Sequence, residues 1–300
     1  MNSKIKRSPM FYVGDKYKLI GEIKQYFPKN IDTFIEPFVG GGTVFLNTQA
    51  NQYILNDIDK NVYKLHNFLK GKSAESDFLK EVLQYVKKYN LSRSFVEDIV
   101  SEEVKKKYKK TYYAIHNKDG YNKLKQDFNK TDKKDSLLLY VLLIYGFNRM
   151  LRFNSKGEFN VPVGNVDFNK NVEKAIKDYF GFVKEKEIKL ENLDFKIFIK
   201  KNGFKKNDFM YLDPPYLITF SEYNKIWNEE KEIELLTLLD ELNDKDIRFA
   251  ISNVTTYKGR ENAIFIDWMG KYKNAKIKSN YISYHDNSNK EFEEVLVFNY

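Results

Sequence analysis

The sequence predicts an α/β fold interrupted by a mostly helical insertion. Short apolar runs alternate with helical patterns before about residue 57 and again after about residue 170. Between them, residues 70–135 are rich in lysine, follow a helical pattern and contain no strand-like run. We therefore expect one α/β domain formed by residues 1–69 and 169–300, with residues 70–168 inserted between its two parts as a second domain.

The first part has the pattern of an opening βαβ unit. Apolar residues at helical spacing predict a helix over residues 15–27. Strands are expected over residues 32–38 and 53–56, separated by a turn at the glycines of 40–43 and a helix that begins at 44–48. The glycine turn would then lie at the carboxyl end of the first strand.

The insertion is expected to end in an apolar helix over residues 136–147. The segment 148–164 follows, and within it the sequence from Ser155 to Glu158 indicates a hairpin turn. Helices and strands then alternate again, and the last two strands suggest an antiparallel finish to the sheet. Helices are expected over 172–185, 195–201 and 229–243, and strands over 188–192, 209–213, 247–253, 275–286 and 293–300.

The composition excludes several kinds of site. The chain of 300 residues has no cysteine, which removes disulfides, thiolate metal ligands and a cysteine nucleophile. Its three histidines, His66, His116 and His285, lack the spacing of zinc ligands, so we expect no metal site. The longest apolar run, 137–145, is too short to cross a membrane, and no signal-peptide core is present. We expect a soluble, cytoplasmic protein that acts as a monomer.

The charge favours an anionic partner. The 51 basic residues outnumber the 42 acidic ones, which gives a net charge of +9 at pH 7. Such a balance is typical of proteins that bind nucleic acid, although many basic proteins bind none. Only six of the basic residues are arginines, so the pair Arg149 and Arg152 stands out.

Three consecutive glycines, Gly40 to Gly42, follow the first predicted strand. A lone glycine cluster is usually a tight turn, but α/β folds bind nucleotide-like ligands at this place because the backbone can approach closely. Asp57 ends the second strand, where a carboxylate can accept hydrogen bonds from both hydroxyls of a ribose. Glu36 adds negative charge that suits a cationic ligand. Since both the dinucleotide and the P-loop spacings are absent, we expect a ligand with an adenosine ribose but no pyrophosphate.

The segment Asp213-Pro214-Pro215-Tyr216 ends the apolar strand at 209–213. Asp213 could merely cap a turn there, but the full segment suits the activation of an exocyclic amine on a nucleobase. If the Asp213 carboxylate and the Pro214 carbonyl each accept one N–H, the lone pair of the amine is freed to attack an electrophile. The prolines fix the carbonyl because their φ is restricted, and Tyr216 can stack on a base taken out of the duplex.

These segments together resemble the D12-class DNA adenine-N6 methyltransferases of the Dam family, most closely those of T-even phages. The similarity runs in order through FYVGDKYKL, FIEPFVGGGTVFLN, YGFNRMLRFNSKGEFNVPVG and LDPPYLITFSEYNKIW. It implies a Rossmann-like class I methyltransferase sheet with an inserted helical target-recognition domain. It also implies S-adenosyl-L-methionine as methyl donor and double-stranded DNA as substrate, commonly with adenine in GATC flipped out and methylated.

The resemblance also suggests roles for individual residues. Lys16 would lie near the methionine carboxylate of the cofactor, and Asp213, Pro214 and Tyr216 would be catalytic. Many relatives have Gly where this chain has Asp15, which leaves the role of Asp15 open. The positions expected to bind the cofactor are Tyr12, Lys16, Glu36, Phe38, Gly40, Gly42, Thr43, Asp57 and Asp213.

In the insertion, the resemblance places Phe147 where a ring wedges into the base stack and Asn148 where a side chain contacts an orphaned base. Arg152 falls where the family contacts guanine, a bidentate contact worth about 1–3 kcal/mol. We interpret Arg149 as a phosphate contact or part of an exposed helix face. The positions expected to bind DNA are Phe147, Asn148, Arg149, Met150, Arg152, Asn154 and Pro162, with Met150 and Pro162 facing a thymine methyl group.

Other activities stay open on the sequence alone. Similar loops occur in enzymes that methylate cytosine N4, RNA adenine or protein glutamine. A non-catalytic DNA-binding protein with a decayed methyltransferase fold is a further alternative, although the glycine loop, Asp57, Asp213 and Tyr216 are intact. The glycine spacing disfavours a nicotinamide-dependent oxidoreductase.

Overall fold

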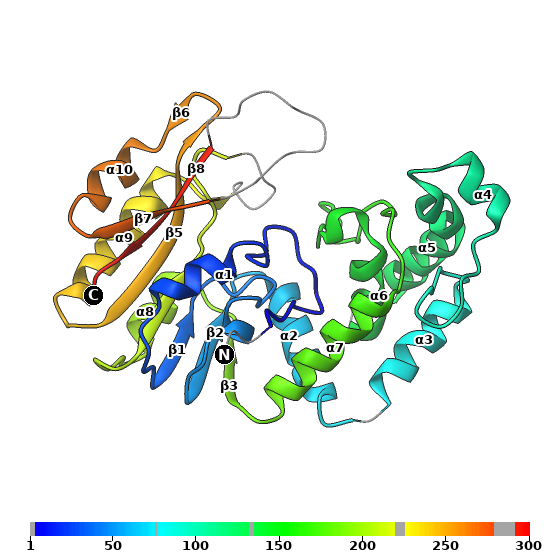
Figure 1. Cartoon of the computed structure of the whole chain (residues 1–300), viewed down its shortest axis with the longest axis horizontal. Helices are drawn as coiled ribbons and strands as arrows, with labels where there is room; N and C mark the ends of the chain where they lie inside the picture. Colours follow the sequence, from blue (N-terminus) through cyan, green and yellow to red (C-terminus); the bar gives the residue numbers. More distant parts are fainter. Residues whose placement is uncertain (1–3, 76, 132–134, 220–225, 279–291) are drawn as a thin grey trace.

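The protein is described by a computed structural model, in which residues 4–75, 77–131, 135–219, 226–278 and 292–300 are placed (Figure 1). A central sheet has the strand order β3-β2-β1-β4-β5-β8-β7, and the short strand β6 pairs with β5. The first five strands of this order are mutually parallel, whereas β8 runs antiparallel to both β5 and β7. The predicted α/β class and the antiparallel finish are therefore confirmed.

The strands lie close to their predicted positions. The exception is the strand expected over 275–286, most of which falls outside the described residues. The strands are β1 (Thr33–Glu36), β2 (Gln52–Asn56), β3 (Glu187–Glu191), β4 (Phe209–Leu212), β5 (Arg248–Tyr257), β6 (Arg260–Glu261), β7 (Lys273–Ile277) and β8 (Phe292–Phe298).

Alternate residues of each strand enter cores on opposite faces of the sheet, as the period of two requires. In β1, Phe34 belongs to the core on one face and Ile35 to the core on the other. The face of Ile35 is covered by α8 (Phe195–Lys201), α9 (Glu229–Asn243) and α10 (Ala263–Met269). The face of Phe34 is covered by α1 (Ile20–Ile23), α2 (Lys60–Lys72) and α7 (Lys170–Val183) (Figure 1).

The segment predicted as an insertion is helical. It contains α3 (Phe78–Lys88), α4 (Glu102–Lys107), α5 (Tyr112–Lys130) and α6 (Ser136–Tyr145), which gather to one side of the sheet (Figure 1). Every residue of α6 from Leu138 to Tyr145 is buried, which explains why this helix is apolar all round. A bridge between Phe153 and Phe159 closes the predicted hairpin, with Gly157 at φ 69° in its turn.

Two predicted helices are wrong in extent. Over 15–27 only α1 and the 3-10 turn η1 (Lys24–Tyr26) form, because residues 15–19 make turns that carry Lys16 to the carboxyl edge of the sheet. After the glycines, only the 3-10 turn η2 (Phe45–Asn47) forms. The Asn47 amide there bonds the backbone of Lys6 at 2.8 Å, a tertiary contact that competes with helix continuation.

Within the described part of the chain, every helix is too short or too polar to span a bilayer.

Candidate active site

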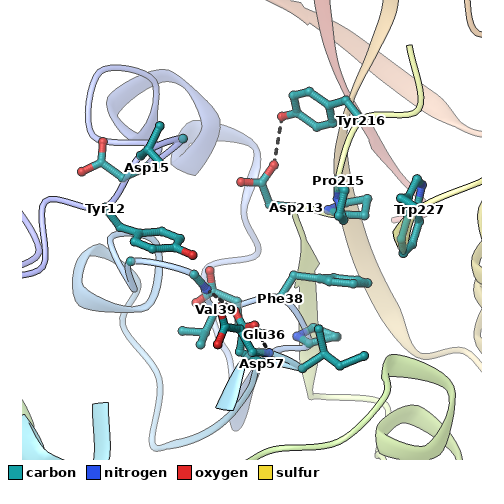
Figure 2. A pocket seen from close by; sticks show the side chains of 18 of the residues that line it. Tyr12, Asp15, Glu36, Phe38, Val39, Asp57, Asp213, Pro215, Tyr216 and Trp227 are labelled. Carbon is teal, nitrogen blue, oxygen red and sulfur yellow. Dashed lines mark hydrogen bonds between the residues drawn. The ribbon is translucent and has the colours of Figure 1, made fainter. Parts of the chain in front are cut away.

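The two sequence motifs meet at the carboxyl edge of the sheet. The glycine loop follows β1 and the Asp-Pro-Pro-Tyr segment follows β4, and these two strands are hydrogen-bonded neighbours. The chain order along the sheet reverses between β1 and β4, the place where open α/β sheets bind ligands. A cavity of about 880 Å³ lies there, which is a size suited to a cofactor (Figure 2).

Asp213 is held by two protein donors. Its Oδ2 lies 2.5 Å from the Lys16 ammonium, and its Oδ1 accepts a hydrogen bond of 2.9 Å from the Tyr216 hydroxyl (Figure 2). The Lys16 side chain is only 4% exposed, whereas the Asp213 side chain is 21% exposed, so the carboxylate is the partner that is open to the cavity. Pro214 and Pro215 end the fully buried strand β4, because proline cannot continue the ladder. The carboxylate therefore lines the cavity in a fixed orientation with a cation beside it.

The glycine loop forms a tight cradle. A Cβ on Gly42 would lie 2.4 Å from Phe45 Cε1, and a Cβ on Gly41 would lie 2.9 Å from the Cβ of Tyr12. Gly40 and Gly42 also have positive φ values of 47° and 77°, which side chains other than glycine rarely adopt. The structure thus requires glycine here for reasons of both conformation and space.

His66 on α2 supports this loop and was missed from the sequence. Its Nε2 lies 2.8 Å from the carbonyl oxygen of Gly40. Burial lowers the pKa of His66 to about 4, so the ring is neutral near pH 7 and Nε2 donates this bond. The sequence indicated only that His66 lies on the buried face of an amphipathic helix, and a histidine there usually contributes to packing and not to a ligand site.

Two acidic side chains line the cavity beside the loop. Asp57 accepts hydrogen bonds of 2.9 Å from the backbone N–H groups of Gly40 and Asp59, yet burial raises its pKa to about 7. Glu36 is 2% exposed, and burial followed by the nearby charge of Asp213 raises its pKa well above the usual value. The sequence suggested a negative charge at Glu36, and the raised pKa shows that its buried surroundings disfavour the ionised form.

The donors and acceptors of the cavity fit S-adenosyl-L-methionine. Within the described part of the chain, Glu36 Oε2 and the Thr43 hydroxyl are buried without a hydrogen-bond partner, which costs free energy that a ligand contact would recover. Asp57 keeps acceptor capacity for ribose hydroxyls, and Lys16 supplies a cation for a carboxylate. All the predicted cofactor positions line this one cavity: Tyr12, Lys16, Glu36, Phe38, Gly40, Gly42, Thr43, Asp57 and Asp213.

An aromatic wall closes one side of the cavity. The Phe38 and Trp227 rings are nearly perpendicular at 5.7 Å, and Trp227 also packs on Phe195 at 5.5 Å (Figure 2). Trp227 Nε1 donates a hydrogen bond of 2.6 Å to the buried Glu232, which fixes the indole. No role was predicted for Trp227 from the sequence, although it ends the segment LDPPYLITFSEYNKIW that resembles the family.

Comparison with known proteins decides the family. A model of the D12 class of N6 adenine-specific DNA methyltransferases matches residues 12–281. The chain belongs to this class. It is 35% identical to the type II methyltransferase M.FokI of Planomicrobium okeanokoites, covering all of this chain and 43% of that protein. It is 30% identical to the modification methylase StsI of Streptococcus sanguinis, covering 98% of this chain and 43% of that protein. The chain thus spans less than half the length of these two relatives.

A third relative is similar in size to this chain. The DNA adenine methylase of Escherichia coli K12 is 30% identical over 269 residues, which cover 85% of this chain and 83% of that protein. The family resemblance inferred from the motifs is therefore confirmed. In the described residues of this D12-class methyltransferase, no three His, Cys, Asp or Glu side chains gather as they would to hold a metal ion.

The predicted DNA-contacting positions of this D12-class protein are distributed around the site. Arg152 lines the same cavity as Asp213, and its guanidinium is aligned by two hydrogen bonds to Asn160, of 2.9 and 3.1 Å. Phe147 is 48% exposed, and Asn148 and Pro162 are exposed too. Met150 is half-buried against the core.

Asn154 is used inside the hairpin, where its side chain bonds Glu158 and the backbone of Lys156. Its Nδ2 carries a second N–H, and the expected contact of Asn154 with DNA stays a prediction.

The interpretation of Arg149 as part of an exposed helix face is wrong. Its guanidinium lies 4.2 Å from the centre of the Phe11 ring, and its Nε is buried with no hydrogen-bond partner in the placed segments of the chain. Burial, followed by the charge of Arg7, lowers the pKa of Arg149 to about 10. The backbone at Asn148 and Arg149 has φ 51°, which turns this side chain toward the amino-terminal loop. Phe147, Asn148 and Arg149 line a second cavity of about 800 Å³.

Proposed function

We propose that this protein transfers a methyl group from S-adenosyl-L-methionine to adenine N6 in double-stranded DNA, within the sequence GATC. Membership of the D12 class supports adenine N6 and DNA. The Asp213 carboxylate supports the chemistry, because it lines the same cavity as the glycine cradle and has a cation beside it. This placement is the observation that carries the proposal.

Residues 1–69 and 169–300 would form the catalytic domain and residues 70–168 the target-recognition domain, acting as a monomer. Arg152 connects methyl transfer with target recognition, since it lines the cavity and belongs to the segment expected to contact DNA. The basic charge of the chain favours the DNA backbone. We propose that Phe147 enters the base stack and that Arg152 contacts a guanine.

When bound, S-adenosyl-L-methionine supplies a methyl carbon attached to a positively charged sulfur. Tyr12, Phe38 and the glycine loop would hold its adenosine, and Asp57 would accept from the ribose hydroxyls. Lys16, which lies 2.5 Å from Asp213 Oδ2, would also serve as the cation for the methionine carboxylate. A Lys16 side chain engaged by that carboxylate would leave Asp213 as an acceptor for the amino group of adenine.

Asp213 and the Pro214 carbonyl then accept the two protons of the adenine amino group. This arrangement draws the nitrogen toward tetrahedral geometry and localises its lone pair for attack. Tyr216 stacks on the flipped base and, through its hydroxyl, fixes the Asp213 carboxylate at 2.9 Å. No covalent bond between enzyme and substrate is required.

The test is to incubate the protein with unmethylated plasmid and labelled S-adenosyl-L-methionine and to map the modified bases by sequencing. We expect N6-methyladenine at GATC sites. Asp267→Asn changes an exposed acid far from the motifs and should behave as the wild type. A different consensus would remove the GATC assignment alone, whereas modification of RNA or protein without DNA would overturn the substrate.

A further inference from the structure

A second carboxyl group reaches the site from the far end of the chain. Glu294 on β8 is 1% exposed, and its Oε1 lies 3.1 Å from the Tyr216 hydroxyl. Its Oε2 is buried and has no hydrogen-bond partner among the residues that the structure describes. None of the functions assigned above uses this side chain, and burying an acid with an unsatisfied oxygen costs free energy that an apolar residue would avoid.

The strand aims Glu294 at Tyr216. Leu296, two residues along β8, packs in the core on the α1 face, whereas Val295 and Val297 enter the opposite core. Glu294 therefore shares the α1 face, and Glu293 points the other way and pairs with Lys276 at 2.5 Å. The pairing of β8 with β5 shifts register next to Glu294 because β5 carries an extra residue, Thr255, so β8 itself keeps its regular alternation there.

The three groups form a chain. The Tyr216 hydroxyl lies 2.9 Å from Asp213 Oδ1 and 3.1 Å from Glu294 Oε1. A hydroxyl carries one proton and can donate to one carboxylate while it accepts from the other. Such a group can pass a proton from one acid to the next without moving its oxygen.

The proposed reaction creates a need for such a path. When the bond from N6 to the methyl carbon forms, the bond from carbon to sulfur breaks and leaves its electron pair on sulfur. The amino nitrogen then holds two protons, a methyl group and a positive charge, and it must lose one proton. Asp213 is the adjacent acceptor, but it must be ionised again before the next turnover.

We propose that Glu294 is the terminal acceptor of this proton, which reaches it from Asp213 through the Tyr216 hydroxyl. Asp213 takes the proton from N6 on Oδ2, its carboxyl group turns so that this proton faces Tyr216, and the Tyr216 oxygen accepts it as the Tyr216 proton passes to Glu294. Glu294 afterwards releases it to water when the products leave. Glu294 is thus a positioning and proton-accepting residue that acts through Tyr216, and the inference rests on the proposed methylation of adenine N6.

The surroundings of Glu294 set the pH at which this step operates. Burial raises the pKa of Glu294 to about 6, with Lys16 opposing the shift and Asp213 adding to it. Above about pH 6 the group is ionised and can accept a proton, and below it the group is already protonated. The titratable groups that face it are Lys16, Glu22, Asp213 and Tyr216, with Tyr211 buried nearby.

The test compares Glu294→Gln with the wild type in multiple-turnover methylation from pH 5 to pH 9, because the proposed relay restores the Asp213 carboxylate between turnovers. Glutamine keeps the size and can accept from Tyr216, but it cannot take up a proton. We expect a rate roughly 10²-fold lower at pH 8, the low end for general acid–base catalysis. The deficit should shrink as pH falls below about 6, because the wild-type Glu294 is then protonated too. Glu293→Gln, on the opposite face of β8, should keep the wild-type profile.

Tyr216→Phe breaks the same chain at its middle and leaves the ring. It should lose a similar factor at pH 8, and the double variant Tyr216→Phe/Glu294→Gln should lose no more than either single one. If Glu294→Gln does not fold, the pH profile of Tyr216→Phe tests the proposal in its place.

Two results would overturn the proposal: a wild-type rate for Glu294→Gln at pH 8, or a deficit that is constant across pH, as a purely structural defect would give. Failure of the proposed function itself is distinguishable, because the wild type would then produce no N6-methyladenine.

Discussion

The glycine cradle yields a quantitative prediction from two glycines with nearly the same backbone. Gly42 has φ 77° and Gly14 has φ 80°, so alanine at either position carries a similar left-handed strain of about 1–2 kcal/mol. A Cβ on Gly14 meets no described atom within 4 Å, whereas one on Gly42 lies 2.4 Å from Phe45 and 2.8 Å from His66. Those two rings are buried and belong to packed helices or turns, so neither can move freely.

Gly42→Ala should therefore cost more stability than Gly14→Ala by the overpacking contribution, roughly 1–3 kcal/mol. Urea unfolding followed by tryptophan fluorescence would measure the difference directly. Displacement of His66 should also disturb its bond to the Gly40 carbonyl, so a calorimetric titration of Gly42→Ala should show weaker binding of S-adenosyl-L-methionine. Equal destabilisation by the two substitutions would refute the argument that space, in addition to conformation, requires glycine at this position.

Three further substitutions test separate parts of the site. Burial raises the pKa of Glu36 in the folded state above its unfolded value, so the stability of the wild type falls as pH rises from the unfolded pKa toward the folded one. Glu36→Gln should therefore lose less stability than the wild type between pH 5 and pH 8 in thermal unfolding. The same dependence of stability on pH in both proteins would contradict this. Lys16→Met should weaken the binding of S-adenosyl-L-methionine by about 1.5–3 kcal/mol, which is the contribution of a hydrogen bond to a charged group. Calorimetry that shows wild-type affinity would exclude Lys16 as the cation that binds the methionine carboxylate. Arg152→Ala should relax discrimination at one guanine, measured on a set of single-base variants of the target, whereas uniformly weaker binding would indicate a phosphate contact.

The sequence was informative wherever a structural element is determined locally. The strands of the sheet are short apolar runs, and β4 ends where Pro214 and Pro215 require it to end. The glycine loop and Asp213 could be placed together because parallel strands present their carboxyl ends at one edge. The hairpin at 153–159 followed from its own turn residues.

The features that were missed depend on contacts between distant segments. The helix expected at 44–48 is replaced by a 3-10 turn because Asn47 bonds the backbone of Lys6, 41 residues away. Glu294 contacts Tyr216 across 78 residues, and a single acid in a terminal strand gives no local sign of that partner. Arg149 packs on Phe11 through a backbone with positive φ at Asn148 and Arg149, a conformation that is common for asparagine but rare for arginine.

The most direct test of the central claim is chemical analysis of the methylated nucleoside. Duplex DNA is incubated with the protein and labelled S-adenosyl-L-methionine, digested, and separated by chromatography, with wild type and Asp213→Asn compared at equal cofactor occupancy. The account predicts label in N6-methyldeoxyadenosine alone for the wild type and almost none for Asp213→Asn. Label in N4-methyldeoxycytidine, or a wild-type rate for Asp213→Asn, would contradict the role assigned to the carboxylate at the end of β4.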